Sequence, residues 1–374
     1  MSQTPPSFSE VQVGQELPEI VKGPWTSAHI VRWHIAQENL ERFHYDSEFA
    51  RDVWGLPDTV ANGNWRKYCI AQLCKDWIGY DGWVWKLEMR YSKMQFAGDL
   101  LTTWGRVKRT WEEDGLGFVE LEGGMRNQHG VETTPSIMVL VLPLKQGQEV
   151  PYPFVPPTGS EDDTTTSPLA KGRILPDAQY VTGEVYERYM SRPPSPKVES
   201  WDEVDKSSLR RMVNGIPDHD PLYWDEDFAG KTRFGGIVAP YVYPVEAYKV
   251  PPNLPDQLEE EFANDPNGSG GVGDPRLRRR DDDETEGESS RAIHPDLTAF
   301  FNGGQKYEIF RLLHLGEKCV AQTRPLDVYE KQGAKGRFVV SASRTDYWTT
   351  SGELVMRADQ YGVQMDPSSV PAQK

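Results

Sequence analysis

Residues 44–63 read HYDSEFARDVWGLPDTVANG, and residues 223–240 read YWDEDFAGKTRFGGIVAP. Each stretch contains an aromatic residue, an aspartate, a Phe-Ala pair, a glycine and a closing Val-Ala. Asp46 and Asp225 hold the same place in the two stretches and lie 179 residues apart. Repetition at the scale of a domain predicts a duplicated structural unit. The copies differ at their first position, where one has a histidine and the other a tyrosine.

Each repeated stretch is followed by the pattern of an antiparallel meander. Apolar and polar residues alternate over 102–107 and 117–121 in the first copy, on either side of a Glu-Glu-Asp-Gly turn. They alternate again around a Gln-Gly turn in the second copy, over 321–323 and 337–341. Such alternation between turn residues predicts antiparallel strands. Residues 65–78 have mostly helical apolar spacing, so we expect a sheet wrapped around a long helix.

Length, charge and cysteine use exclude several classes of protein. A chain of 374 residues is long enough for two domains with real cores. A formal net charge of −16 argues against nucleic-acid binding, which needs a basic surface. No run of residues approaches the roughly 18 apolar residues that a membrane span needs. The amino-terminal stretch resembles no secretion signal, and the three cysteines look unpaired, so we expect a cytoplasmic protein.

The repeat and the composition predict two domains and two irregular segments. We expect an amino-terminal, histidine-bearing unit over residues 8–145 and a second, degenerate unit over 169–366. Residues 146–168, which join them, are rich in Pro, Gly, Ser, Thr and acids and are interpreted as a linker. Residues 255–291 are an acidic insertion whose composition cannot bury enough apolar surface to fold, so we expect a mobile surface loop.

The repeated motifs resemble those of the MaoC-like family of (R)-specific enoyl-CoA hydratases and acyl dehydratases, in particular its fused members. The second copy carries the likeness in PDHDPLYWD at 217–225, TRFGGIVAP at 232–240 and GGQKYE at 303–308. The resemblance implies an α+β double-hotdog fold. In that fold two antiparallel sheets, each wrapping a long central helix, join edge to edge as a pseudo-dimer.

The resemblance also implies a catalytic loop. In that family an Asp and a His, five residues apart, hold the water that adds to the double bond, and an N–H at the start of the central helix binds the thioester oxygen. Matched by position, His44 stands for the family's His and Gly63 for its oxyanion glycine. Asn39 replaces the family's Asp, and an amide cannot accept a proton as a carboxylate does. Glu38 and Glu41 flank it, and a one-residue shift of the loop would present either.

Other candidates are weaker and have ordinary structural alternatives. Substrate binding is assigned to four residues at the start of the long helix, Asn62, Trp65, Arg66 and Lys67. Core packing and a solvated helix face are the structural alternatives for these side chains. Asp218 and Tyr223 mark a candidate second-half site, although loop shaping is the favoured role of Asp218. No His/Cys cluster has metal-ligand spacing and no glycine-rich dinucleotide loop occurs, so we expect neither metal nor cofactor. Coenzyme A enters only as part of the substrate.

The expected activity is reversible addition of water to a 2-enoyl-CoA, with a bulky acyl group from fatty-acid or steroid-like metabolism. Two alternatives stay open. One is a non-catalytic subunit that binds acyl-CoA and supports a partner hydratase, and the other is a hotdog thioesterase. The expected assembly is a homodimer or a complex with a partner hotdog subunit, without nucleic acid or membrane.

Overall fold

A computed structural model of the chain describes residues 5–145, 147–158, 177–271, 293–297, 299–333 and 336–366. The first half contains the 3-10 turns η1 (Phe8–Glu10) and η2 (Arg42–His44), helices α1 (Ser27–Gln37), α2 (Ser47–Asp52) and α3 (Gly63–Ile78), and strands β1 (Ile20–Lys22), β2 (Trp83–Arg90), β3 (Leu101–Glu113), β4 (Leu116–Arg126) and β5 (Ser136–Pro143). None of the helices within these ranges is long and apolar enough to cross a membrane.

The second half repeats this order with additions. Its helices and turns are α4 (Gly183–Met190), α5 (Lys206–Gly215), η3 (Pro221–Tyr223), α6 (Glu226–Ala229), η4 (Tyr243–Glu246) and α7 (Gln257–Asn264). Its strands are β6 (Val198–Glu199), β7 (Ala299–Ile309), β8 (Cys319–Gly333), β9 (Gly336–Thr349) and β10 (Leu354–Met365). The helix α1, turn η2 and helix α2 of the first half thus correspond to α5, η3 and α6 of the second.

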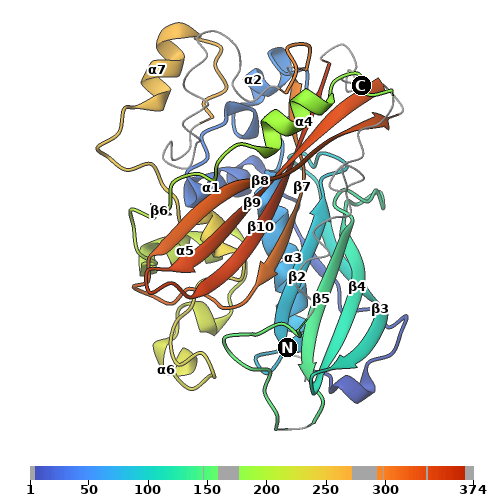
Figure 1. Cartoon of the computed structure of the whole chain (residues 1–374). Coiled ribbons are helices and arrows are strands. Elements are labelled where there is room, and N and C mark those ends of the chain that lie inside the picture. The colour runs from blue at the N-terminus through green and yellow to red at the C-terminus, as the bar shows by residue number, and fades with distance from the viewer. Residues whose placement is uncertain are drawn as a thin grey trace.

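One continuous antiparallel sheet of ten strands unites the two halves. Its order is β1-β3-β4-β5-β2-β7-β10-β9-β8-β6, so each half contributes five strands in mirrored order. The halves meet along β2 and β7, where Leu87 pairs with Tyr307. Figure 1 shows the cyan and green strands of the first half joining the orange and red strands of the second along this line. The predicted duplication and the edge-to-edge pseudo-dimer are confirmed.

Helix α3 is the long central helix expected for the first half. Asn62 caps its start, because its side-chain oxygen accepts from the Asn64 N–H, and Gly79 follows its last residue with φ of 63°. Most of its residues are buried, including the large side chains of Trp65 and Tyr68. A helix buried on nearly every face lies inside a core rather than on a surface. It packs against strands β2 to β5.

The prediction of a second long central helix is wrong for the residues that the structure describes. The longest helix there in the second half is α5, with 10 residues. Directly after the second motif the chain forms the short turn η4, and Tyr68 of α3 donates to the Val242 carbonyl at 3.3 Å. In the register of the repeat, Pro251 and Pro252 fall at mid-helix positions, where proline removes a hydrogen bond and clashes with the preceding turn.

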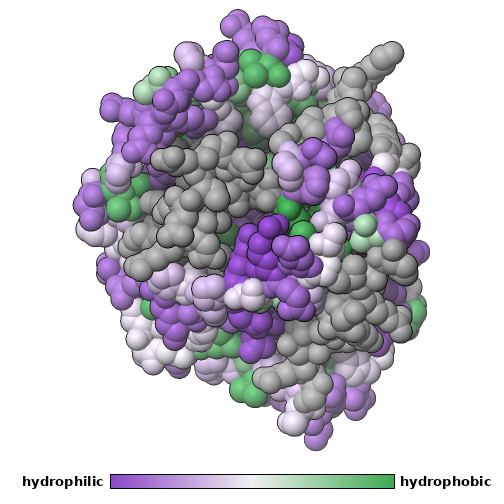
Figure 2. Space-filling view, turned by 45° about the horizontal axis from the view of Figure 1, so that its top comes forward, coloured by the Kyte–Doolittle hydropathy of each residue, from purple (hydrophilic) through white to green (hydrophobic). Residues whose placement is uncertain are grey.

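The two segments predicted to be irregular are partly ordered. In the linker, the Phe154 N–H donates to Phe310 O at 2.7 Å, and both Val150 and Phe154 are buried. In the insertion, Asp256 caps helix α7. Residues 265–271 follow this helix and reach the first half, where Ser269 O accepts from the Arg42 N–H. The rest of both segments, 159–168 and 272–291, lies outside the described residues. On the face seen in Figure 2, the described surface is mostly hydrophilic with small separate hydrophobic groups.

Candidate active site around His44

The imidazole of His44 has a fixed orientation. It lies on η2, is 5% exposed, and its Nδ1 is 2.7 Å from the Val60 carbonyl oxygen. A carbonyl can only accept, so Nδ1 carries the proton and donates it. The neutral ring therefore has its free lone pair on Nε2, which is the atom available for proton transfer.

Asn62 supplies a donor to that lone pair. Its Oδ1 accepts from the Asn64 N–H at 2.6 Å, so the helix cap decides which way the amide points. Its Nδ2 then lies 3.3 Å from His44 Nε2. Because an amide nitrogen only donates, this contact stabilises the neutral imidazole. The sequence placed Asn62 among the substrate-binding residues, and the structure adds this direct contact with the histidine.

Glu41 is the carboxylate closest to the ring. Its Oε2 lies 3.3 Å from His44 Nε2, and its side chain is 37% exposed. A carboxylate accepts from a protonated Nε2 and stabilises the imidazolium by charge. Each protonation state of His44 thus has its own partner, Asn62 for the neutral ring and Glu41 for the charged one.

Asn39 has a different place from the one predicted. Its Oδ1 accepts from the Glu41 N–H at 3.0 Å, and its backbone oxygen meets His34 Nδ1 at 3.0 Å. Asn39 therefore shapes the loop that presents Glu41, and the prediction that its side chain helps His44 to move a proton is replaced. The flanking glutamates were the sequence signal for this outcome, and the loop geometry selects Glu41.

Sequence reasoning missed His34, whose ring lies against the candidate catalytic ring at an angle of 31°. The ring centroids of His34 and His44 are 4.5 Å apart, and His34 is buried in α1. Burial, followed by the charge of His44, lowers the pKa of His34 to about 3. His34 therefore stays neutral and can support a charged neighbour without repelling it. A histidine spaced for the buried face of α1 was the only available signal.

The low pKa of His34 predicts a loss of stability in mild acid. Below pH 6.5 the unfolded chain protonates this histidine while the folded chain, with its pKa of about 3, does not. Lowering the pH from 7.5 to 5 therefore reduces the free energy of unfolding by about 2 kcal/mol. In His34→Phe the free energy of unfolding should fall by correspondingly less over that range. Urea denaturation at both pH values measures the free energy of unfolding, and His129→Phe, at an exposed position, is the control. An equal pH dependence of stability in the two variants would contradict the low pKa of His34.

Gly63 begins α3 beside these groups. Its N–H lies in the first helical turn, where backbone donors have no intrahelical acceptor and the helix dipole favours negative charge. A Cβ at this position would come within 3.3 Å of the Tyr91 ring, so glycine allows that ring to cover the helix start. The position fits the predicted role of binding a developing oxyanion.

The side chains that follow Gly63 face the interior. Trp65 is fully buried and donates from Nε1 to Gly215 O at 3.2 Å. Arg66 donates to Lys93 O at 2.8 Å, and Lys67 pairs with Glu246 at 2.8 Å with its side chain 0% exposed. A cation that is buried and whose donors are bound within the protein does not present its charge to a phosphate. The prediction that Arg66 and Lys67 bind the substrate is therefore corrected to a structural role.

Residues 269–271 of the second half lie against the loop that leads into His44. The Arg42 N–H donates to Ser269 O at 2.7 Å, and the Arg42 guanidinium lies 4.1 Å from the centroid of the Phe49 ring. At Gly270, with φ of 77°, a Cβ would come within 2.6 Å of Leu40 O. Glycine is therefore needed for the close approach of residues 269–271 to this loop. The insertion thus contacts the loop that leads into His44.

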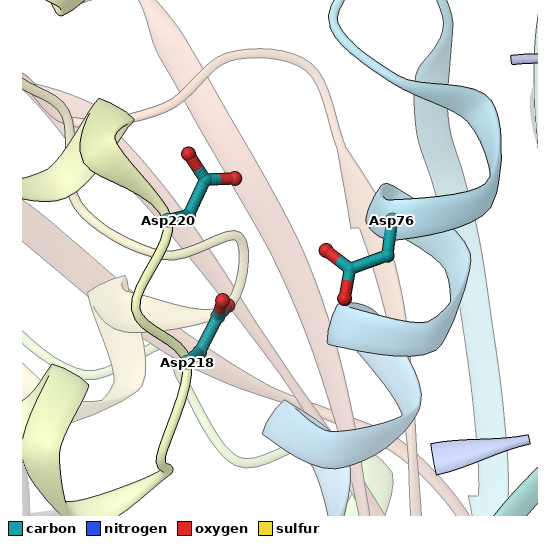
Figure 3. A group of neighbouring side chains, drawn as sticks. All are labelled: Asp76, Asp218 and Asp220. Atoms are coloured by element: carbon teal, nitrogen blue, oxygen red, sulfur yellow. The ribbon is translucent and has the colours of Figure 1, made fainter. Parts of the chain in front are cut away.

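The second motif loop lies at the opposite end of α3. Asp218 is 5% exposed, and Figure 3 shows that it and Asp220 face Asp76 of the helix. Lys75 Nζ lies 2.9 Å from Asp76, 3.2 Å from Asp218 and 2.5 Å from Asp220. Three carboxylates this close are a set that a metal ion would use, but the ammonium group already supplies the positive charge.

Tyr223 completes this second cluster without joining the first. It is buried, and Lys75 Nζ lies 5.3 Å from the centre of its ring. Burial raises the pKa of Tyr223 well above its usual value, so the hydroxyl stays protonated. Asp218 and Tyr223 therefore neighbour Lys75 rather than His44. The expectation that the two motif loops form separate sites agrees with this placement.

Comparison with known proteins identifies the fold. No protein-family model and no curated protein matches the sequence. Among solved structures, a protein described as a MaoC-domain dehydratase from Chloroflexus aurantiacus is 13% identical with a TM-score of 0.58, covering 97% of this chain and 99% of its own. A conserved hypothetical protein of Mycobacterium tuberculosis with a double-hotdog fold is 12% identical with a TM-score of 0.54, covering 96% and 99%. The chain therefore has the double-hotdog fold found in MaoC-like dehydratases.

Proposed function

We propose that the protein catalyses the reversible addition of water to a 2-enoyl thioester, with coenzyme A as the expected carrier. The observation that carries the proposal is the pair of contacts at His44 Nε2, at 3.3 Å from Asn62 Nδ2 and at 3.3 Å from Glu41 Oε2. A ring with a partner for each protonation state, beside a helix N-terminus, suits proton transfer next to a developing enolate.

The proposed reaction uses one proton shuttle. The neutral His44 Nε2 accepts a proton from water as the water oxygen forms a bond to Cβ of the enoyl group. The electron pair of the double bond moves toward the thioester oxygen, which accepts from the Gly63 N–H. Glu41 stabilises the imidazolium during the lifetime of the enolate. His44 then returns the proton to Cα, the carbonyl re-forms, and the 3-hydroxyacyl thioester carries all the atoms of one water.

An approach to Nε2 from the side of Glu41 is part of the proposal. Glu41 is the exposed member of the group, whereas the rings of His34 and Phe43 pack against the imidazole at centroid distances of 4.5 and 4.1 Å. Water and the enoyl carbon would therefore approach between Glu41 and the start of α3. The acyl chain would continue along the surface beside residues 269–271.

Glu41→Gln tests this proposal against its neighbour Glu38→Gln. The Glu41 variant loses the charge that stabilises the imidazolium, so we expect the rate of crotonyl-CoA hydration to fall by about 10²-fold. Glu38 is exposed at the end of α1, so its substitution should leave the rate within about twofold of the parent. The loss of enoyl-thioester absorbance measures both. Equal rates in the two variants would remove Glu41 from the mechanism.

A further inference from the structure

A second hollow lies beside the motif loop of the second half. It has a volume of about 390 Å³ and lies between α5 and the turn that carries Tyr223 and Trp224. Its floor is apolar, formed by Leu209, Val213 and Tyr223, which are 1%, 5% and 3% exposed. Trp224 at its side is 61% exposed, which is unusual for so large an apolar ring. A concave apolar surface of this size is typical of small-molecule sites.

The rim of this hollow is basic. Lys206 and Arg210 stand one helical turn apart on α5, and His219 lies across from them. Lys206 pairs with Glu226, whereas no carboxylate pairs with Arg210 in the ranges that the structure describes. A free guanidinium above an apolar floor offers charge-assisted hydrogen bonds to a carboxylate. In a chain of net charge −16, such a rim is a local exception.

The larger hollow on the other side of His219 has the opposite character. Its volume is about 950 Å³, and five acids line it, Glu19, Asp76, Asp81, Asp218 and Asp220, against the single cation of Lys75. An anion would be repelled there and attracted to the smaller hollow. The two cavities therefore differ in the sign of the ligand charge that each can accept.

The repeat relates the smaller hollow to the site around His44. At the spacing of 179 residues, Val213 takes the place of His34 and Tyr223 that of His44. In the first half these positions hold two imidazoles in contact. In the second half a small aliphatic side chain and a buried tyrosine form an apolar floor instead.

We propose that this hollow binds a carboxylate with an unbranched apolar body, such as a medium-chain fatty acid. The apolar chain lies on Leu209, Val213 and Tyr223, and the carboxylate meets Arg210. The site is separate from His44, so it is independent of the proposed hydration.

Calorimetric titration with octanoate tests the proposal, with 1-octanol as the uncharged control. Octanoate should bind the full-length protein, and octanol should bind at least about tenfold more weakly, because one charge-assisted hydrogen bond is lost. Arg210→Glu should weaken octanoate to a similar extent, whereas the exposed Arg188→Glu on α4 should not. Asn214→Trp, at an exposed position on the rim, should fill the hollow and abolish binding.

Three results would overturn the proposal. They are no binding of octanoate, equal binding of octanoate and octanol, or unchanged binding by both Arg210→Glu and Asn214→Trp. Because Arg210 and Asn214 are exposed, both variants should fold, which thermal unfolding confirms. None of these results depends on hydratase activity, so the outcome is distinct from that of the proposed function.

Discussion

Replacing His44 by alanine is expected to lower the rate of enoyl-CoA hydration by about 10²- to 10⁴-fold, the usual contribution of a positioned acid–base group. The variant loses the only ring whose Nε2 meets both Asn62 and Glu41 among the residues that the structure describes. Binding should change less, because the Gly63 N–H remains in place. Steady-state kinetics with crotonyl-CoA and a longer enoyl-CoA measure the effect on kcat and KM separately.

A matched control separates catalysis from folding. His129 lies exposed in the turn between β4 and β5, so His129→Ala should retain the parent rate. The hydrogen bond from His44 to Val60 O is also lost in His44→Ala, at a cost of about 1 kcal/mol. Thermal unfolding should show that the variant still folds. A folded His44→Ala protein with the parent rate would remove this histidine from the reaction.

Replacing Lys67 by methionine is expected to destabilise the protein by about 3–5 kcal/mol. The ammonium of Lys67 is fully buried in α3, 2.8 Å from Glu246 of the second half, whose side chain is 4% exposed. Burial lowers the pKa of Lys67, and Glu246 opposes this shift. Without the lysine, the glutamate stays in the interior as an unpaired charge. Urea denaturation measures the change in the free energy of unfolding.

The double variant Lys67→Met/Glu246→Leu distinguishes the pair from simple loss of packing. With both charges removed, neither position holds an unpaired buried charge, so most of the lost stability should return. A single Lys67→Met variant that loses less than about 1 kcal/mol would show that water reaches the pair. The result matters for the fold, because this ion pair joins the central helix to the second half, whose described residues form no long helix.

The repeat in the sequence was sufficient to predict the sheet, because alternation and turn residues are local signals. It was also sufficient to place Gly63 at the start of the central helix, since the capping residue Asn62 and the stop residue Gly79 are local sequence signals. That the described residues of the second half form no long helix was predictable in principle from Pro251 and Pro252. The resemblance to a family in which both halves wrap a helix outweighed that signal.

The site depends on contacts that the sequence does not specify. Glu41, rather than Asn39, meets His44 because Asn39 turns its side chain back onto the loop. The partner of Lys67 lies 179 residues away, and no local pattern connects the two. Charged residues at the start of a helix usually face solvent, so their burial between two halves is a property of the duplicated fold.

Mass spectrometry of the product formed in water labelled with oxygen-18 tests the central claim most directly. Incubated with a panel of enoyl-CoA substrates, the protein should form a 3-hydroxyacyl-CoA that carries one labelled oxygen on the acyl chain, and His44→Ala should form almost none. Release of free coenzyme A with label in the carboxylate, or unchanged enoyl-CoA throughout the panel, would contradict the proposed hydration.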